Sequence, residues 1–184
     1  MYRYPSYKGK ITLRTWLSKY SFIKGTRENI IYDEQSNIIG RAKGLWVFYD
    51  IQKRRPIKIF EQIKKKWSLC EEVSIDHDIS MKIEAIDSAN YVKEFNVNKY
   101  DTDMNKHVNN IRYLQWVIES IPEEIANNYY LQFIDGRFIF EAQLGDTVLS
   151  LTNTNITNNS FRHSIKIKGS NKICAIANTI WKQI

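Results

Sequence analysis

The chain has 184 residues, of which 43% are apolar and 26% charged, so it can bury a hydrophobic core and is not a disordered tail. Basic residues outnumber acidic ones by 27 to 20, and the resulting net charge of +7 favours an anionic partner. No apolar run could span a membrane, the first residues do not resemble a signal sequence, and Cys70 and Cys174 lack metal-type spacing. We therefore expect a cytoplasmic protein without a membrane span, a metal site, a cofactor or a disulfide framework.

The first part of the chain predicts strands followed by one short helix. Alternating, β-rich residues predict strands over 10–20, 26–33 and 38–51. Pro56 and three basic residues before it interrupt this pattern, and an amphipathic helix is predicted over 57–67. The polar, mixed segment that follows predicts a linker over 71–90.

The second part of the chain predicts one long helix among five strands. The same alternation predicts strands over 91–98, 131–143, 147–154, 161–168 and 173–182. Between the first two, apolar residues recur at steps of three and four from Ile111 to Ile121, which is the period of a helix. Pro122 ends this pattern, because the residue before a proline is displaced from the helical region. The predicted helix covers residues 108–121.

An internal repeat relates the two parts. Residues 27–46 match residues 162–181 without a gap at a constant offset of 135, including Trp46 with Trp181. We interpret the chain as two copies of one unit: a strand, a long helix and an antiparallel meander. The first copy's opening strand and helix would then precede residue 1, either lost by truncation or supplied by another chain. Such an uncovered apolar sheet face promotes association, for example as a homodimer.

A polar stretch precedes the predicted helix. Asp103, Asn105 and His107 alternate, so in an extended lead-in their side chains lie on one side of the backbone. They would be close to the positive end of the helix dipole, where negative charge is stabilised. The alternative interpretation is that these polar groups only cap the helix.

This stretch resembles the signature of plant and bacterial acyl-acyl-carrier-protein (acyl-ACP) thioesterases. The matching residues are Asp103, Asn105, His107, Val108, Asn109, Asn110, Tyr113, Trp116 and Glu119. Further landmarks resemble the family's first domain, namely Thr15, Trp16, Trp46, Asp50, Arg54, Arg55 and Pro56. The resemblance implies an α+β tandem hot-dog fold, in which an antiparallel sheet wraps round a central helix. We divide the chain into an incomplete hot-dog domain at 1–70, the linker at 71–90 and a catalytic hot-dog domain at 91–184.

The resemblance also implies a catalytic set in the second domain. It comprises Asp103, Asn105, His107 and a glutamate from a following strand, which we assign to Glu141 from the pattern Phe-x-x-Glu. The plant enzymes often carry cysteine after this glutamate, whereas this chain has Ala142, so a cysteine nucleophile is out of reach. The chain also departs from the family by lacking the upstream helix of the first domain.

The expected chemistry is hydrolysis of a thioester, which needs a water, a base and donors for the carbonyl oxygen. Glu141 would activate the water, unless it acts as a nucleophile or is simply an outward-facing strand residue. Asn105 would orient the acyl group or the water, and His107 would partner Asn105 or Glu141. Asp103 would fix this network or form a plain Asx turn. The N–H groups around Val108 and Asn109 would bind the oxyanion.

The implied partner is an acidic acyl carrier protein whose phosphopantetheine arm holds the acyl chain. The basic clusters at 53–55 and 64–66 would attract it. Alternatives are an acyl-coenzyme-A thioesterase and a non-catalytic acyl-binding remnant. Nucleic-acid binding is not expected, since no basic stripe alternates with stacking aromatics. We expect Trp16, Trp46 and Trp181 in the core and His163 facing solvent.

Overall fold

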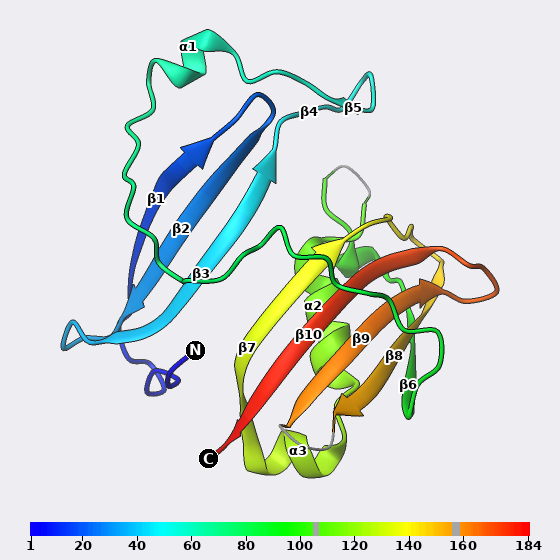
Figure 1. The fold of residues 1–184 in the computed structure, drawn as a ribbon. Coiled ribbons are helices and arrows are strands. Elements are labelled where there is room, and N and C mark those ends of the chain that lie inside the picture. Colours follow the sequence, from blue (N-terminus) through cyan, green and yellow to red (C-terminus); the bar gives the residue numbers. More distant parts are fainter. Residues whose placement is uncertain (105–106, 156–158) are drawn as a thin grey trace. The chain divides into compact units, whose positions relative to one another are not determined.

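The computed structural model describes residues 1–104, 107–155 and 159–184. Contacts divide the chain into two compact units, Met1–Met81 (unit 1) and Lys82–Ile184 (unit 2). Each unit is built on its own antiparallel sheet (Figure 1). Over the described ranges, no helix is long and apolar enough to cross a membrane.

Unit 1 contains a three-stranded meander in the order β1–β2–β3. Its elements are β1 (Thr12–Tyr20), β2 (Lys24–Tyr32), β3 (Ile38–Val47), β4 (Tyr49–Asp50), β5 (Arg55–Pro56) and α1 (Glu61–Lys64). The strands predicted over 10–20 and 26–33 are confirmed. The strand predicted over 38–51 ends at Val47 and is followed by β4, and the helix predicted over 57–67 is only one turn long. Ile57 and Ile59 instead donate backbone hydrogen bonds to Phe48 and Phe22, which keeps that part of the chain extended.

A buried carboxylate attaches the start of the 71–90 segment to this sheet. Glu28 accepts hydrogen bonds from the backbone N–H of Ser74 (3.0 Å) and from the hydroxyl of Ser18 (3.0 Å). The ammonium group of Lys43 lies 3.7 Å from the same carboxylate, which is almost fully buried. A buried charge requires such partners, so this segment is held in place by the sheet that it covers.

Unit 2 is a five-stranded antiparallel sheet, in the order β6–β8–β9–β10–β7, with one long helix across a face (Figure 1). Its strands are β6 (Tyr91–Asn96), β7 (Tyr129–Phe138), β8 (Thr147–Asn155), β9 (Ser160–Ile167) and β10 (Ile173–Gln183). Its helices are η1 (Lys99–Asp101), α2 (Asn110–Glu119) and α3 (Glu123–Asn128). This is the predicted hot-dog arrangement of the α+β class.

The helix α2 begins at a side-chain cap and buries one face on the sheet. The side-chain oxygen of Asn109 accepts the N–H of Ile111, which satisfies one of the free donors of the first turn. Tyr113, Trp116 and Val117 face the sheet and form the hydrophobic core with residues of β8, β9 and β10. This apolar face anchors the start of the helix, where the candidate site lies.

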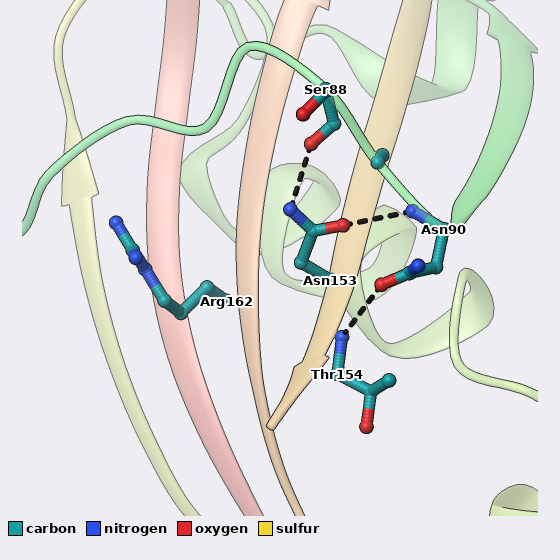
Figure 2. Close-up of a pocket in the computed structure, with 6 residues that line it drawn as sticks. Ser88, Asn90, Asn153, Thr154 and Arg162 are labelled. Carbon is teal, nitrogen blue, oxygen red and sulfur yellow. Dashed lines mark hydrogen bonds between the residues drawn. The ribbon is translucent and has the colours of Figure 1, made fainter. Parts of the chain in front are cut away.

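The end of the 71–90 segment is attached to the sheet of unit 2. The side chain of Asn153 accepts the N–H of Asn90 and donates to the carbonyl of Ser88, both at 2.8 Å (Figure 2). The N–H of Ile86 donates to the buried hydroxyl of Ser164 at 2.8 Å. The segment has neither helix nor strand, yet both of its ends are held by hydrogen bonds.

The repeat of the sequence is present in the fold, but its strand register is not kept. In unit 1, Asn29 pairs with Ala42. The offset of 135 would pair Ser164 with Ala177, whereas unit 2 pairs His163 with Ala177. A shift of one residue turns a strand's side chains to the opposite faces of a sheet. Faces predicted from one copy therefore do not transfer to the other.

The two matched tryptophans also differ in burial. Trp181 is 6% exposed and lies in the core, whereas Trp46 is 61% exposed, so the prediction of a core position for Trp46 was wrong. Trp16 is buried as predicted.

His163 was predicted to face solvent and is instead buried, with 1% of its surface exposed. Its two ring nitrogens lie 3.0 Å from the hydroxyl of Thr152 and 2.9 Å from the hydroxyl of Thr179. Because both nitrogens have a partner, the ring can be buried in its neutral form. Burial lowers the pKa of His163 from 6.5 to about 3.

Candidate active site

The polar lead-in to α2 is held by the carboxylate of Asp101. One of its oxygens accepts the N–H of Asn98 at 2.7 Å, and the other lies 3.1 Å from Nε of Arg112. The carbonyl of Asp101 accepts the N–H of Asn109 at 2.8 Å. The prediction that the N–H of Asn109 binds an oxyanion was therefore wrong, because this donor already has an internal acceptor.

The next turn positions His107. The N–H of Asp103 donates to the carbonyl of His107 at 2.8 Å, and the carboxylate of Asp103 accepts the N–H of His107 at 3.2 Å. Asp103 thus contacts the backbone of His107. Asn105, the amide of the predicted set, lies outside the described residues.

Glu141 comes from the loop that follows β7. The N–H groups of Ile139 and Phe140 both donate to the carbonyl of Cys174, and β7 ends before them at Phe138. The strand predicted over 131–143 therefore ends five residues too late. The prediction that Glu141 lies in a strand was wrong. Leaving the ladder lets this loop run towards the lead-in of α2, because an isolated antiparallel bridge pairs His107 with Gln143.

The two loops bring His107 and Glu141 together. Nδ1 of His107 lies 3.3 Å from Oε2 of Glu141, and the two side chains are 41% and 63% exposed. At this distance a ring N–H of His107 can interact directly with the carboxylate of Glu141. The pair is in contact with solvent, so water can reach it.

The residue after Glu141 faces inwards. Ala142 is fully buried in the core, and its N–H donates to the hydroxyl of Tyr113 at 2.9 Å. A cysteine at this position would therefore point into the core and not towards a substrate. Burial raises the pKa of Tyr113 to about 12. The signal for this contact in the sequence is the hydroxyl of Tyr113 on the apolar face of the predicted helix, since a buried hydroxyl requires a hydrogen-bond partner.

Other features of the surface do not extend this site. A hollow of about 500 Å³ on unit 2 is lined by Ser88, Ala89, Asn90, Asn153, Thr154 and Arg162, none of which belongs to the predicted catalytic set (Figure 2). Within the ranges that the structure describes, no three histidine, cysteine or acidic side chains converge as metal ligands would.

Two family models cover most of the chain. Residues 1–67 match the acyl-ACP thioesterase N-terminal domain, and residues 83–183 match the acyl-ACP thioesterase C-terminal domain. The chain belongs to the acyl-ACP thioesterase family. The second match contains the His107 and Glu141 loops, so the predicted family is confirmed over the segment that carries the candidate site.

Two curated relatives in this family come from plants. The chain is 26% identical to oleoyl-acyl carrier protein thioesterase 1 of Arabidopsis thaliana, with 100% of this chain and 58% of the relative covered. It is 30% identical to the corresponding Coriandrum sativum protein, with 96% and 50% covered. The chain thus spans about half the length of these curated relatives.

Solved structures of acyl-ACP thioesterases share the fold. The 12:0-ACP thioesterase from Umbellularia californica has a TM-score of 0.86 at 22% identity, over 99% of this chain and 71% of that one. An acyl-ACP thioesterase from Bacteroides thetaiotaomicron has a TM-score of 0.82 at 21% identity, over 95% and 69%.

Proposed function

We propose that this acyl-ACP thioesterase family member hydrolyses fatty acyl thioesters of acyl carrier protein, releasing the free fatty acid and ending chain elongation. The observation that carries the proposal is the 3.3 Å contact between Nδ1 of His107 and Oε2 of Glu141 at a solvent-accessible position. A carboxylate beside an imidazole can take a proton from water as the water attacks.

In the proposed mechanism, His107 donates to one carboxylate oxygen of Glu141 and fixes its orientation. Glu141 then removes a proton from a water molecule that attacks the thioester carbonyl. The tetrahedral intermediate collapses, the carbon–sulfur bond breaks, and the thiolate of the carrier takes up a proton. Asp103 acts on the backbone of His107, and Asn105 orients the acyl group or the water.

A nucleophilic role for Glu141 predicts a different fate for the oxygen atoms. Attack by the carboxylate would form a mixed anhydride, and its hydrolysis would place oxygen from water in the Glu141 side chain. A single turnover in labelled water separates the two routes. We propose the general-base route, which leaves Glu141 unlabelled.

The proposed carrier is an acidic protein attracted by the basic hairpin, defined as Lys53, Arg54 and Arg55. Lys53 and Arg54 lie in the exposed turn between β4 and β5, and Arg55 begins β5. The side chain of Asp50 accepts the N–H of Lys53 at 2.9 Å. Lys65 and Lys66 add exposed positive charge after α1. Clustered charges of one sign raise the rate of encounter with an oppositely charged protein.

The test is a hydrolysis assay with one acyl chain on two carriers, acyl carrier protein and coenzyme A, repeated over a series of chain lengths. We expect a higher kcat/KM with the carrier protein. His107→Ala and Glu141→Ala should each abolish turnover while circular dichroism and thermal unfolding stay as in the unmodified protein. The exposed glutamate Glu84 supplies the matched control, since Glu84→Ala should retain full activity.

Other outcomes identify the alternatives. Equal or better hydrolysis of the coenzyme A ester would favour an acyl-coenzyme-A thioesterase. Acyl binding without hydrolysis would favour a non-catalytic protein, and near-normal activity of either alanine variant would contradict the site. A cytoplasmic location and a homodimer stay predictions; three plant relatives named as oleoyl-acyl carrier protein thioesterases are also named as chloroplastic proteins.

A further inference from the structure

We infer that Tyr113 is a positioning residue, whose hydroxyl fixes the peptide between Glu141 and Ala142 and thereby the orientation of Glu141 towards His107. The inference rests on the proposed function, because it assigns Tyr113 a role in the same reaction. It concerns a residue inside the core that does not contact the substrate.

The contact is buried and well formed. The N–H of Ala142 lies 2.9 Å from the hydroxyl oxygen of Tyr113, and the two residues are 0% and 1% exposed. The ring of Tyr113 is held by Trp116 at a centroid distance of 5.4 Å and by Phe138 at 6.1 Å. Close packing on these sides leaves the phenol little freedom, so the position of its oxygen is set by the core.

Planarity of the peptide carries this constraint to Glu141. The N–H of Ala142 lies in one plane with the carbonyl and Cα of Glu141, since the peptide bond does not rotate freely. An acceptor that fixes this N–H therefore holds the peptide plane that contains the Cα of Glu141, and it limits how far the Glu141 side chain can be displaced. Without it, the loop could rotate about single bonds, and a displacement of about 1 Å at a reacting group can cost 10²-fold in rate.

The following residue is fixed by a different element. The N–H of Gln143 donates to the carboxylate of Asp146 at 2.8 Å, and the carbonyl of Asp146 accepts the N–H of Val97 at 2.9 Å. Tyr113 supplies the constraint from α2, the helix whose lead-in carries His107. Both members of the candidate pair are thus positioned relative to the start of one helix.

The hydroxyl itself does not act as an acid or a base. Burial raises the pKa of Tyr113 to about 12, so the phenol keeps its proton through the neutral range in which thioesterases are assayed. Its role is therefore that of a neutral hydrogen-bond partner with a fixed position.

The test compares Tyr113→Phe with Thr152→Val in the full chain. Tyr113→Phe keeps the ring and removes the acceptor of the Ala142 N–H. Thr152→Val removes another buried hydroxyl of unit 2, which lies 3.0 Å from Nδ1 of His163. Thr152 is not part of the candidate site. We expect Tyr113→Phe to lower kcat about tenfold or more with KM within twofold, and to accelerate hydrogen exchange of the Ala142 amide. Thr152→Val should keep kcat at a temperature where both variants are folded.

The outcomes separate this inference from the proposed function. If the unmodified chain hydrolyses no thioester, the proposed function fails, although the faster exchange of the Ala142 amide is still expected. If the unmodified chain is active and Tyr113→Phe retains its kcat, the positioning role is wrong. Equal losses of kcat in the two variants would also overturn it, because they would reflect general destabilisation.

Discussion

Nδ1 of His107 lies 3.3 Å from Oε2 of Glu141, although one residue precedes α2 and the other follows β7. Backbone pairing between His107 and Gln143 brings the two loops together. The contact therefore depends on the whole of unit 2, because the sheet must place the end of β7 beside the start of the helix.

Removing the negative charge of Glu141 should stop the reaction with little change in stability. Glu141→Gln keeps the size and polarity of the side chain but loses the base, and we expect kcat to fall about 10²–10⁴-fold. The side chain is 63% exposed, so the thermal unfolding midpoint should stay close to that of the unmodified protein. Glu84→Gln serves as the control. A Glu141→Gln variant with more than a tenth of the original kcat would exclude Glu141 as the base.

The carboxylate of Asp103 should matter less than that of Glu141, because it contacts the backbone of His107. We expect Asp103→Ala to lower kcat about tenfold, since the bond from the N–H of Asp103 to the carbonyl of His107 remains. Asp103→Asn keeps an acceptor oxygen and should recover most of the activity. Steady-state rates of the two variants show whether Asp103 only positions the backbone of His107. If Asp103→Asn is as inactive as Glu141→Gln, the negative charge of Asp103 itself takes part in catalysis.

Reversing the charge of the basic hairpin should weaken use of a carrier-protein substrate. With residues 53–55 changed to glutamate, we expect KM for an acyl-ACP to rise severalfold at low salt and to lose its dependence on ionic strength. An uncharged acyl N-acetylcysteamine thioester should be hydrolysed as before. The same reversal at the exposed residues Lys24, Lys82 and Lys182 controls for net charge. An unchanged KM in the hairpin variant would mean that the carrier protein binds at a surface other than the basic hairpin.

His163 should make the protein less stable in acid. Its pKa is 6.5 when unfolded and about 3 when folded, because burial disfavours the charged ring. The unfolded chain therefore binds a proton first as the pH falls below 6.5, and the free energy of unfolding should drop by up to about 1.4 kcal/mol per pH unit towards pH 3. Urea unfolding between pH 7 and 4 measures this slope. His163→Gln should show a shallower slope, and identical slopes would mean that other groups cause the acid sensitivity.

Local patterns were enough to identify most elements and the chemical groups of the site. The spacing of three and four residues between apolar side chains before Pro122 predicts a helix with one apolar face, and α2 lies within the predicted range. The antiparallel meanders could also be predicted, because alternating apolar and polar residues and the turn residues between them are local features of the sequence. The resemblance of residues 103–119 then led to the family that the comparisons show.

Burial, strand register and the meeting of distant groups depended on the tertiary structure. His163 could be buried only because Thr152 and Thr179 on the neighbouring strands supply both of its partners. Trp46 and Trp181 match in sequence but differ in exposure, since Trp181 packs with Ile121 and Phe161 whereas Trp46 lies at the exposed end of β3. Such outcomes rest on contacts between residues far apart in the chain, which no local pattern encodes.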